Sequence, residues 1–222
     1  MEKGEAGKEH LLDGYHTRNQ LPHRKRQGGT YFVSFRLAGT LPHTLIAELK
    51  RERELIVENA ERAQRPLSWT ERRRLFEWYS ERVDSWLDAC HGECWLRRKE
   101  IADLVAGAVQ FFEGRRYELH AWAVMPNHVH VVVQPLGEHS LSAILHSWKS
   151  FTANRANDLL KRSGKPFWQV EAYDHLIRDE EDLNRCRAYT EFNPVKAGLC
   201  EYPEQWQWSS AYMRALGGSA QR

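Results

Sequence analysis

Four short runs of β-branched and aromatic residues have the length and composition of β-strands. They lie at residues 30–37, 117–124, 129–133 and 173–177. The second and third runs are joined by Met125, Pro126 and Asn127, and His128 directly precedes the third run. Proline and asparagine favour a turn. The sequence therefore predicts a central β-hairpin, preceded by a first core strand that begins near residue 30.

Between the first and second of these runs, apolar residues recur at helical spacing and are surrounded by charged ones. Two such segments, at residues 43–59 and 70–89, are separated by Pro66, which interrupts a helix. We therefore predict a charged helical hairpin. It is longer than a minimal domain requires, so we treat residues 43–89 as an insertion that forms a DNA-binding surface, a partner surface or only an extension.

Three further helices are predicted along the chain. Residues 99–113 carry an apolar stripe and are followed by Gly114, a suitable C-cap. Residues 140–162 begin at the N-cap Ser140 and also present one apolar face. The last helix begins near Asp179 with acidic residues in its first turn, and we expect Pro194 to stop it.

This order of elements predicts an α+β domain with an antiparallel sheet that helices cover mainly on one face. We divide the chain into a polar, basic lead-in at residues 1–29, a single catalytic domain at 30–200 and a C-terminal tail at 201–222. The chain has 222 residues, 41% of them hydrophobic, which suffices for one core. No segment approaches the roughly 18 apolar residues of a membrane span, and the first residues lack the apolar core of a secretion signal. We expect a soluble, cytoplasmic protein.

Four cysteines are too few for a disulfide framework in a chain of this size, and a reducing compartment keeps them as thiols. Cys90 and Cys94, with His91 between them, have a spacing that zinc can use. A fourth ligand at standard spacing is missing, which argues against a zinc site.

The formal net charge of +2 does not identify a nucleic-acid-binding protein, but the positive charges are grouped. One group contains Arg24, Lys25 and Arg26 without an acid nearby, and a second begins at Lys149 and runs to residue 165 with only one opposing carboxylate. Two basic zones suggest an anionic partner. The alternative interpretation is that each zone is simply a solvated face.

His128 and His130 are the strongest chemical signal in the sequence. Successive side chains of a strand point to opposite faces, so these two imidazoles point the same way. Two imidazoles on one face can bind a divalent metal, and additional oxygen ligands would suit manganese or magnesium. Histidines that have only a structural role often show the same spacing by chance. The pair alone therefore does not establish a metal site, and a second motif is needed to support one.

That second element is the helix segment that contains Tyr189 and Asn193. Residues four apart on a helix point to one side, so a phenol and an amide oxygen face a common partner. A phenol with an ordinary pKa of about 10 becomes an oxygen nucleophile toward phosphorus when a nearby cation favours the phenolate or polarises the phosphate. A tyrosine packed in the helix with its hydroxyl at the surface is the structural alternative.

In these motifs the sequence resembles the single-tyrosine transposases that carry a histidine-hydrophobic-histidine motif, and within them the REP-associated tyrosine transposases. His128-Val129-His130 and Asn193-Pro194-Val195-Lys196 carry much of the resemblance. Further segments match in the same order along most of the chain: residues 21–23, 29–37, 94–96, 120–127, 145–151, 167–169, 173–175 and 177–181.

The resemblance implies a ferredoxin-like α+β domain whose histidine pair holds a divalent metal, Mg²⁺ or Mn²⁺. It implies that Tyr189 is the nucleophile and that Asn193 is the third metal ligand, next to His128 and His130. The implied reaction is attack of the tyrosine on a phosphodiester of single-stranded or hairpin DNA, which gives a 5′-phosphotyrosine and a free 3′-hydroxyl, followed by reversal onto another end. Asp174 and His175 match a family motif, and we expect them to form a buried hydrogen-bonded pair.

For the DNA we expect contacts from Arg24, Lys25, Arg26 and Lys149, because basic grooves hold single strands. Trp148, which could stack on a base, shares an apolar stripe and is expected in the core. Three rival functions remain: a repeat-DNA-binding protein that no longer cleaves, a nicking initiator of replication or transfer, and a metal hydrolase unrelated to DNA. A monomer and a homodimer both remain open.

Overall fold

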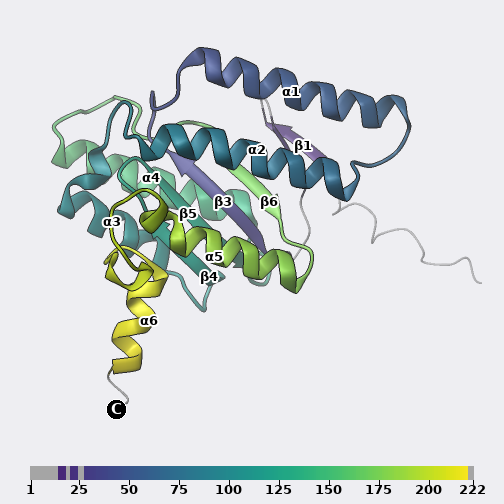
Figure 1. Ribbon diagram of the computed structural model, residues 1–222. Helices are drawn as coiled ribbons and strands as arrows, with labels where there is room; N and C mark the ends of the chain where they lie inside the picture. Colours follow the sequence, from purple (N-terminus) through teal and green to yellow (C-terminus); the bar gives the residue numbers. More distant parts are fainter. Residues whose placement is uncertain (1–14, 19–20, 25–27, 220–222) are drawn as a thin grey trace, which may run out of the picture.

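The computed structural model describes residues 15–18, 21–24 and 28–219 of the chain (Figure 1). Its centre is a four-stranded antiparallel sheet in the order β4-β5-β3-β6. The strands of this sheet are β3 (Tyr31–Arg36), β4 (Tyr117–Val124), β5 (His128–Pro135) and β6 (Tyr173–Leu176). The helices are α1 (His43–Arg62), α2 (Trp69–Asp88), α3 (Lys99–Gln110), α4 (Leu141–Leu159), α5 (Glu180–Lys196) and α6 (Ser210–Ser219). The α+β fold class and the antiparallel sheet are confirmed.

Short elements complete this list. The strands β1 (Tyr15–Arg18) and β2 (Leu21–Arg24) pair with each other within the segment expected as a lead-in. Two 3₁₀ turns, η2 (Trp95–Arg97) and η3 (Pro203–Gln205), precede α3 and α6. None of the helices in the described ranges has the length and apolar content of a membrane span.

One face of the sheet packs against α3 and α4. The residues of β5 that point to this face are Val129, Val131 and Val133, all fully buried. The apolar stripe of α3 and the inner side of α4 complete this larger of the two sheet cores, with Ile101 and Trp148 among its members. Trp148 is 3% exposed and belongs to the core, as its place in the stripe predicts.

The other face of the sheet is also covered, which corrects the expectation that helices lie mainly on one face. A smaller core cluster here combines Phe32, Ala121 and Val132 of the sheet with Cys186 of α5. The last turns of α2 reach the same face, because Asp84 approaches His130. The apolar pattern of α5 is weak, since its inner side carries polar residues, and sequence periodicity could not assign it to a face.

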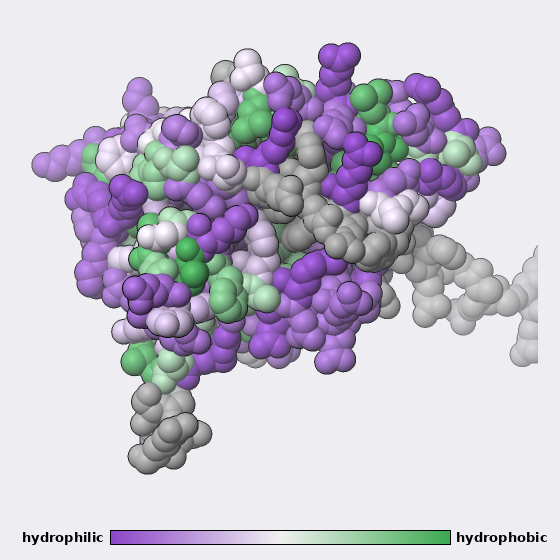
Figure 2. Space-filling view, viewed as in Figure 1, coloured by the Kyte–Doolittle hydropathy of each residue, from purple (hydrophilic) through white to green (hydrophobic). Residues whose placement is uncertain are grey.

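The predicted charged hairpin is present as α1 and α2. Ser68 caps α2 by accepting a hydrogen bond from the Glu71 amide, and Arg65 forms an ion pair with the Glu71 carboxylate. Leu41 and Leu49 pack against Val83 and Leu87 near the base of the hairpin. Hydrophilic residues dominate the visible face of the molecule, including its upper part where α1 lies (Figure 2).

Helix α5 continues past Pro194 to Lys196, so the expected stop at Pro194 is wrong. A proline in the last turn removes one backbone N–H, and the helix tolerates this loss because so little of it remains. The turn that ends α5 is made by Gly198, whose φ of 69° lies in the left-handed region. Beyond residue 200, expected as a tail, Trp206 donates a hydrogen bond to the carbonyl of Val124 at 3.0 Å, so this segment lies against β4.

Candidate active site

His128 and His130 both belong to β5 and point to the face covered by α2 and α5. Their Nε2 atoms are 3.0 Å apart, and the two ring planes are nearly perpendicular, at 79°. The residues beside His130 on the neighbouring strands are Ser34 on β3 and Ala123 on β4. Both are small, so the sheet leaves space above His130 for side chains from the covering helices.

Asn127 fixes the orientation of His128. Its amide nitrogen donates to the carbonyl of Leu87 at 2.9 Å, and its amide oxygen lies 2.8 Å from Nδ1 of His128. The carbonyl of Leu87 can only accept a hydrogen bond, so the group that faces it is the NH₂ of Asn127. The amide oxygen therefore faces His128, and Nδ1 of His128 must carry the hydrogen. The lone pair of His128 therefore sits on Nε2, the atom that faces His130.

Helix α5 brings Tyr189 and Asn193 over the histidines. The ring centroid of Tyr189 is 5.5 Å from that of His130 and 5.6 Å from that of Phe32, in edge-on arrangements. Asn193 is 1% exposed. Among the described residues, neither its amide oxygen nor its amide nitrogen has a hydrogen-bond partner in good geometry. The expected placement of both residues on one side of the helix is thus consistent with their position in the fold.

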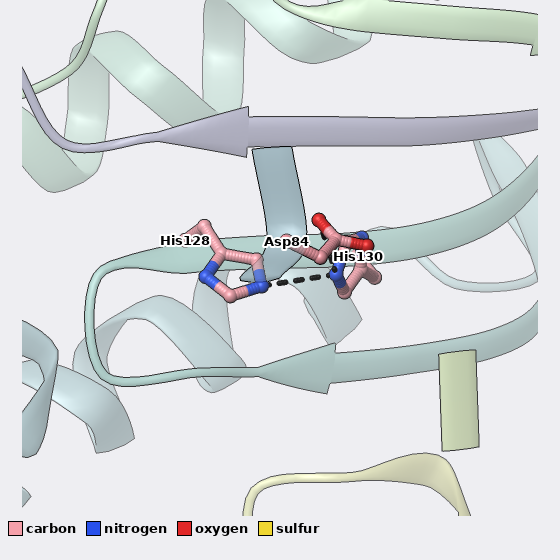
Figure 3. A group of neighbouring side chains, drawn as sticks. All are labelled: Asp84, His128 and His130. Carbon is pink, nitrogen blue, oxygen red and sulfur yellow. Dashed lines mark hydrogen bonds and ion pairs between the residues drawn. The ribbon is translucent and has the colours of Figure 1, made fainter. Parts of the chain in front are cut away.

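A carboxylate from α2 joins this group. An Oδ1 of Asp84 lies 3.8 Å from Nε2 of His130, and both side chains are 1% exposed. Figure 3 shows the Asp84 carboxylate next to the His130 ring. A dashed line in the same view joins the His130 ring to that of His128. One ligand atom from each of the three residues lies within 4.8 Å of the others.

Burial controls the protonation of this group. Burial lowers the pKa of His128 to about 3, opposed by the nearby Asn193 side chain. The pKa of His130 is also far below its ordinary value, because of burial first and then of the charges of His128 and Lys196. Burial, with the charge of Asp88, raises the pKa of Asp84. Both imidazoles are therefore neutral at neutral pH and have lone pairs for a metal.

The donor set fits a divalent cation. Two imidazole nitrogens, an amide oxygen and a carboxylate are ligands of manganese and related ions, and the oxygen donors also suit magnesium. The site contains buried polar atoms without partners in the described part of the chain: Oδ2 of Asp84, Nδ1 of His130 and both amide atoms of Asn193. Buried polar groups normally have partners, so the unpaired Oδ2 of Asp84 and the unpaired amide oxygen of Asn193 are oxygen ligands available to a cation.

Of the residues expected to contact DNA, only Lys149 has a side chain that the structure describes. Arg24 lies in β2, where only the backbone is described, and Lys25 and Arg26 lie outside the described residues. Lys149 lies on α4, and its ammonium donates to the carbonyls of Gln169 and Val170 at 2.6 and 2.7 Å. Burial lowers the pKa of Lys149 to about 8, with a further contribution from Arg36.

His175 forms a hydrogen-bonded pair, but its partner is Asp182 at 2.8 Å rather than Asp174. Adjacent residues of β6 point to opposite faces, which separates the side chains of Asp174 and His175. Asp182 also accepts from Arg185. The Cys186 thiol completes a second group of possible ligands, but the pairing of His175 with Asp182 accounts for both side chains.

Three residues at the site were not singled out as functional from the sequence. Asn127 precedes the first histidine within a quoted motif, and Lys196 lies seven residues after Tyr189, a spacing of two helical turns that points to the same side. The Lys196 ammonium is 5.9 Å from the centroid of the Tyr189 ring. Asp84 has no local signal, because it reaches the site only through the docking of α2.

Comparisons with known proteins find transposases. A family model described as "Transposase IS200 like" matches residues 97–192, which include both histidines and Tyr189 and end one residue before Asn193. A REP-associated tyrosine transposase of Haemophilus influenzae is 30% identical over 105 residues, and one of Escherichia coli is 28% identical over 105 residues. These alignments cover 42% and 47% of this chain, and 58% and 60% of those relatives.

A solved structure described as a REP-associated tyrosine transposase bound to a REP hairpin has the same fold, with a TM-score of 0.51 at 18% identity. The match covers 88% of this chain and 86% of that one. The alignments with curated relatives span about three fifths of those relatives' length. Together these matches confirm the resemblance: residues 97–192 are similar to the IS200-like transposases, and the chain is similar to REP-associated tyrosine transposases over about three fifths of their length.

Proposed function

We propose that this chain cleaves and rejoins single-stranded DNA, with Tyr189 as the nucleophile and a divalent metal at His128, His130 and Asn193. One observation carries the proposal: α5 brings a tyrosine and a buried amide over the paired imidazoles of β5. A fold alone does not determine function, but a nucleophile beside a metal-ligand set on a transposase relative supports this chemistry.

The bound metal, Mg²⁺ or Mn²⁺, would polarise and orient the scissile phosphate as a Lewis acid. The oxygen of Tyr189 attacks the phosphorus and loses its proton, and the bond from phosphorus to the 3′ oxygen breaks. The 3′ oxygen takes up a proton, which leaves a free 3′-hydroxyl and a 5′-phosphotyrosine. Rejoining reverses these steps, with a 3′-hydroxyl as the attacking group and the tyrosine as the leaving group.

The residues around the site have supporting roles in this proposal. Asn127 keeps the lone pair of His128 directed at the metal position. Lys196 is exposed next to Tyr189, where its positive charge would attract a phosphate and favour the phenolate. Tyr189 is itself half-buried, so the DNA would approach from the side of α5 on which these two residues lie.

We infer that the substrate is hairpin DNA with a single-stranded flank. The relative of known structure is described as bound to a REP hairpin. In this chain the candidate DNA contacts remain Arg24, Lys25, Arg26 and Lys149. Lys149 holds two backbone carbonyls, so its contribution to DNA binding would include positioning the segment around residues 169 and 170.

The test is incubation of the protein with labelled single-stranded hairpin DNA and Mn²⁺ or Mg²⁺, followed by a denaturing gel. We expect a metal-dependent covalent adduct in the wild-type protein and none in Tyr189→Phe, while both bind the hairpin equally. Tyr212→Phe, which changes a tyrosine of α6, is the matched control and should retain the adduct.

Each rival function gives a different result in the same experiment. Hairpin binding without an adduct, across a set of hairpins, would support a non-cleaving DNA-binding protein. Cleavage that persists in Tyr189→Phe would support a metal hydrolase. An adduct formed with origin or transfer sequences but not with hairpin repeats would support a nicking initiator.

A further inference from the structure

Asp84 is a buried carboxyl group that faces the histidine pair from α2. Its side chain is 1% exposed, and its Oδ2 has no hydrogen-bond partner among the residues that the structure describes. Its other oxygen is 3.8 Å from Nε2 of His130, which is too far for a hydrogen bond. That Nε2 already faces Nε2 of His128 at 3.0 Å. Ionisation of this buried carboxyl is unfavourable without a cation beside it, and a divalent metal at the histidines would supply that positive charge.

The position of Asp84 is built into the fold. The neighbouring residues Val83 and Leu87 are fully buried against α1 and the segment before it. The carbonyl of Leu87 accepts a hydrogen bond from Asn127, the same residue that orients His128. Trp86 donates to the carbonyl of Thr40 at 3.0 Å. These contacts hold this turn of α2 over the histidines, so Asp84 does not reach the site by chance.

We propose that Asp84 is a further ligand of the divalent metal, and that the inserted helical hairpin is therefore part of the active site. This inference rests on the proposed function for the presence of the metal. It extends the ligand set from two imidazoles and an amide to one that includes a charged oxygen. A carboxylate strengthens the preference of the site for hard cations such as Mg²⁺ and Mn²⁺. Four protein ligands would leave open positions for a phosphate oxygen in an octahedral site.

Asp88, one turn further along α2, provides a matched control. It is also a carboxylate near Lys196, and its Oδ1 is also buried without a partner in the described part of the chain. It does not belong to the group of ligand atoms around the histidines. Asp84→Asn and Asp88→Asn each replace one carboxyl of α2 by an amide of the same shape, so the pair separates direct metal binding from a general effect of removing an acid near the site.

The experiment is calorimetric titration of Mn²⁺ into the full-length protein without DNA, together with thermal unfolding at increasing Mn²⁺. We expect Asp84→Asn to weaken Mn²⁺ binding about tenfold or more, a loss at least as large as that for residues that only orient ligands. Asp88→Asn should change the affinity less than about threefold. The metal-induced rise in Tm should shrink in Asp84→Asn alone, because a ligand stabilises only the fold that it binds.

Thermal unfolding without added metal tests the alternative that Asp84 is structural. Replacing a buried carboxyl whose Oδ2 has no hydrogen-bond partner in the described part of the chain should leave the Tm of Asp84→Asn unchanged or raised, whereas loss of a structural hydrogen bond would lower it. Equal Mn²⁺ affinity in wild type and Asp84→Asn, or equal losses in both variants, would overturn the role of Asp84 only. Absence of Mn²⁺ binding by the wild type would overturn the metal site itself. Asp84→Ala gives the same comparison if the asparagine variant does not fold.

Discussion

Asn127 links two parts of the site, so its removal should damage both folding and metal binding. The side chain is completely buried. Its amide oxygen accepts from Nδ1 of His128, and its amide nitrogen donates to the carbonyl of Leu87 at the end of α2. In Asn127→Ala both partners would be left buried and unpaired. The imidazole of His128 would also lose the group that selects its tautomer.

The size of the effect follows from these two hydrogen bonds. Each buried group left without a partner costs about 1–3 kcal/mol, so two cost about 2–6 kcal/mol. Water that enters the space left by the amide would recover part of this loss, because it can bond to both partners. We therefore expect a loss of about 2–4 kcal/mol in the free energy of unfolding. Loss of an orienting group typically weakens metal binding about 10–100-fold.

Urea unfolding followed by tryptophan fluorescence gives the free energy of unfolding, and Mn²⁺ calorimetry gives the affinity. Asn157→Ala is a matched control on α4, where the amide donates one hydrogen bond to the carbonyl of Lys165 at 2.8 Å. It should cost about 1 kcal/mol and leave Mn²⁺ binding unchanged. If Asn127→Ala loses stability but keeps wild-type Mn²⁺ affinity, then packing rather than Asn127 orients His128, and the reasoning is refuted.

Three further predictions concern groups outside the ligand set. Tyr117→Phe removes a buried hydroxyl that donates to the carbonyl of Val109 and accepts from Trp148, and should cost about 2–4 kcal/mol in urea unfolding. Lys149→Met should cost about 1–3 kcal/mol because two carbonyls lose their donor; a salt dependence of hairpin binding lowered by about one phosphate contact would show that Lys149 also touches DNA. Burial raises the pKa of Asp88 from 3.8 to about 6, so its contribution to stability is present below pH 3.8 and is lost as pH rises through 6. Asp88→Asn should therefore be more stable than wild type by about 1 kcal/mol at pH 8, after allowance for its partial exposure, and no more stable near pH 4; a gain that is the same at both pH values would contradict this.

Local patterns sufficed for much of the fold and for part of the site. The positions of the strands follow from short runs of residues, and the shared face of His128 and His130 follows from strand geometry alone. Tyr189 and Asn193 likewise share one side of α5 because residues four apart on a helix point the same way. In each case the relevant residues are neighbours in sequence, so no knowledge of tertiary packing is needed.

The remaining features depend on contacts between distant segments. The sequence predicts the helices of the hairpin, but not that α2 docks over the histidines, because residues 84 and 130 are brought together only by the folded chain. The expectation about Pro194 failed for a different reason. Proline is unfavourable inside a helix by an amount that a single remaining turn can tolerate, so its presence alone does not locate the end.

The docking of α2 has a consequence for the inserted hairpin as a whole. The side chains next to His130 on the sheet are Ser34 and Ala123, and larger residues there would occupy the space that Asp84 enters. Asn127 holds the end of α2 with one side of its amide and His128 with the other. A movement of α2 that displaces Leu87 would therefore break the hydrogen bond to Asn127, the residue that also orients the proposed metal ligand His128. We expect that a partner that binds the hairpin and shifts α2 would also change the proposed metal site, because Asn127 joins the two.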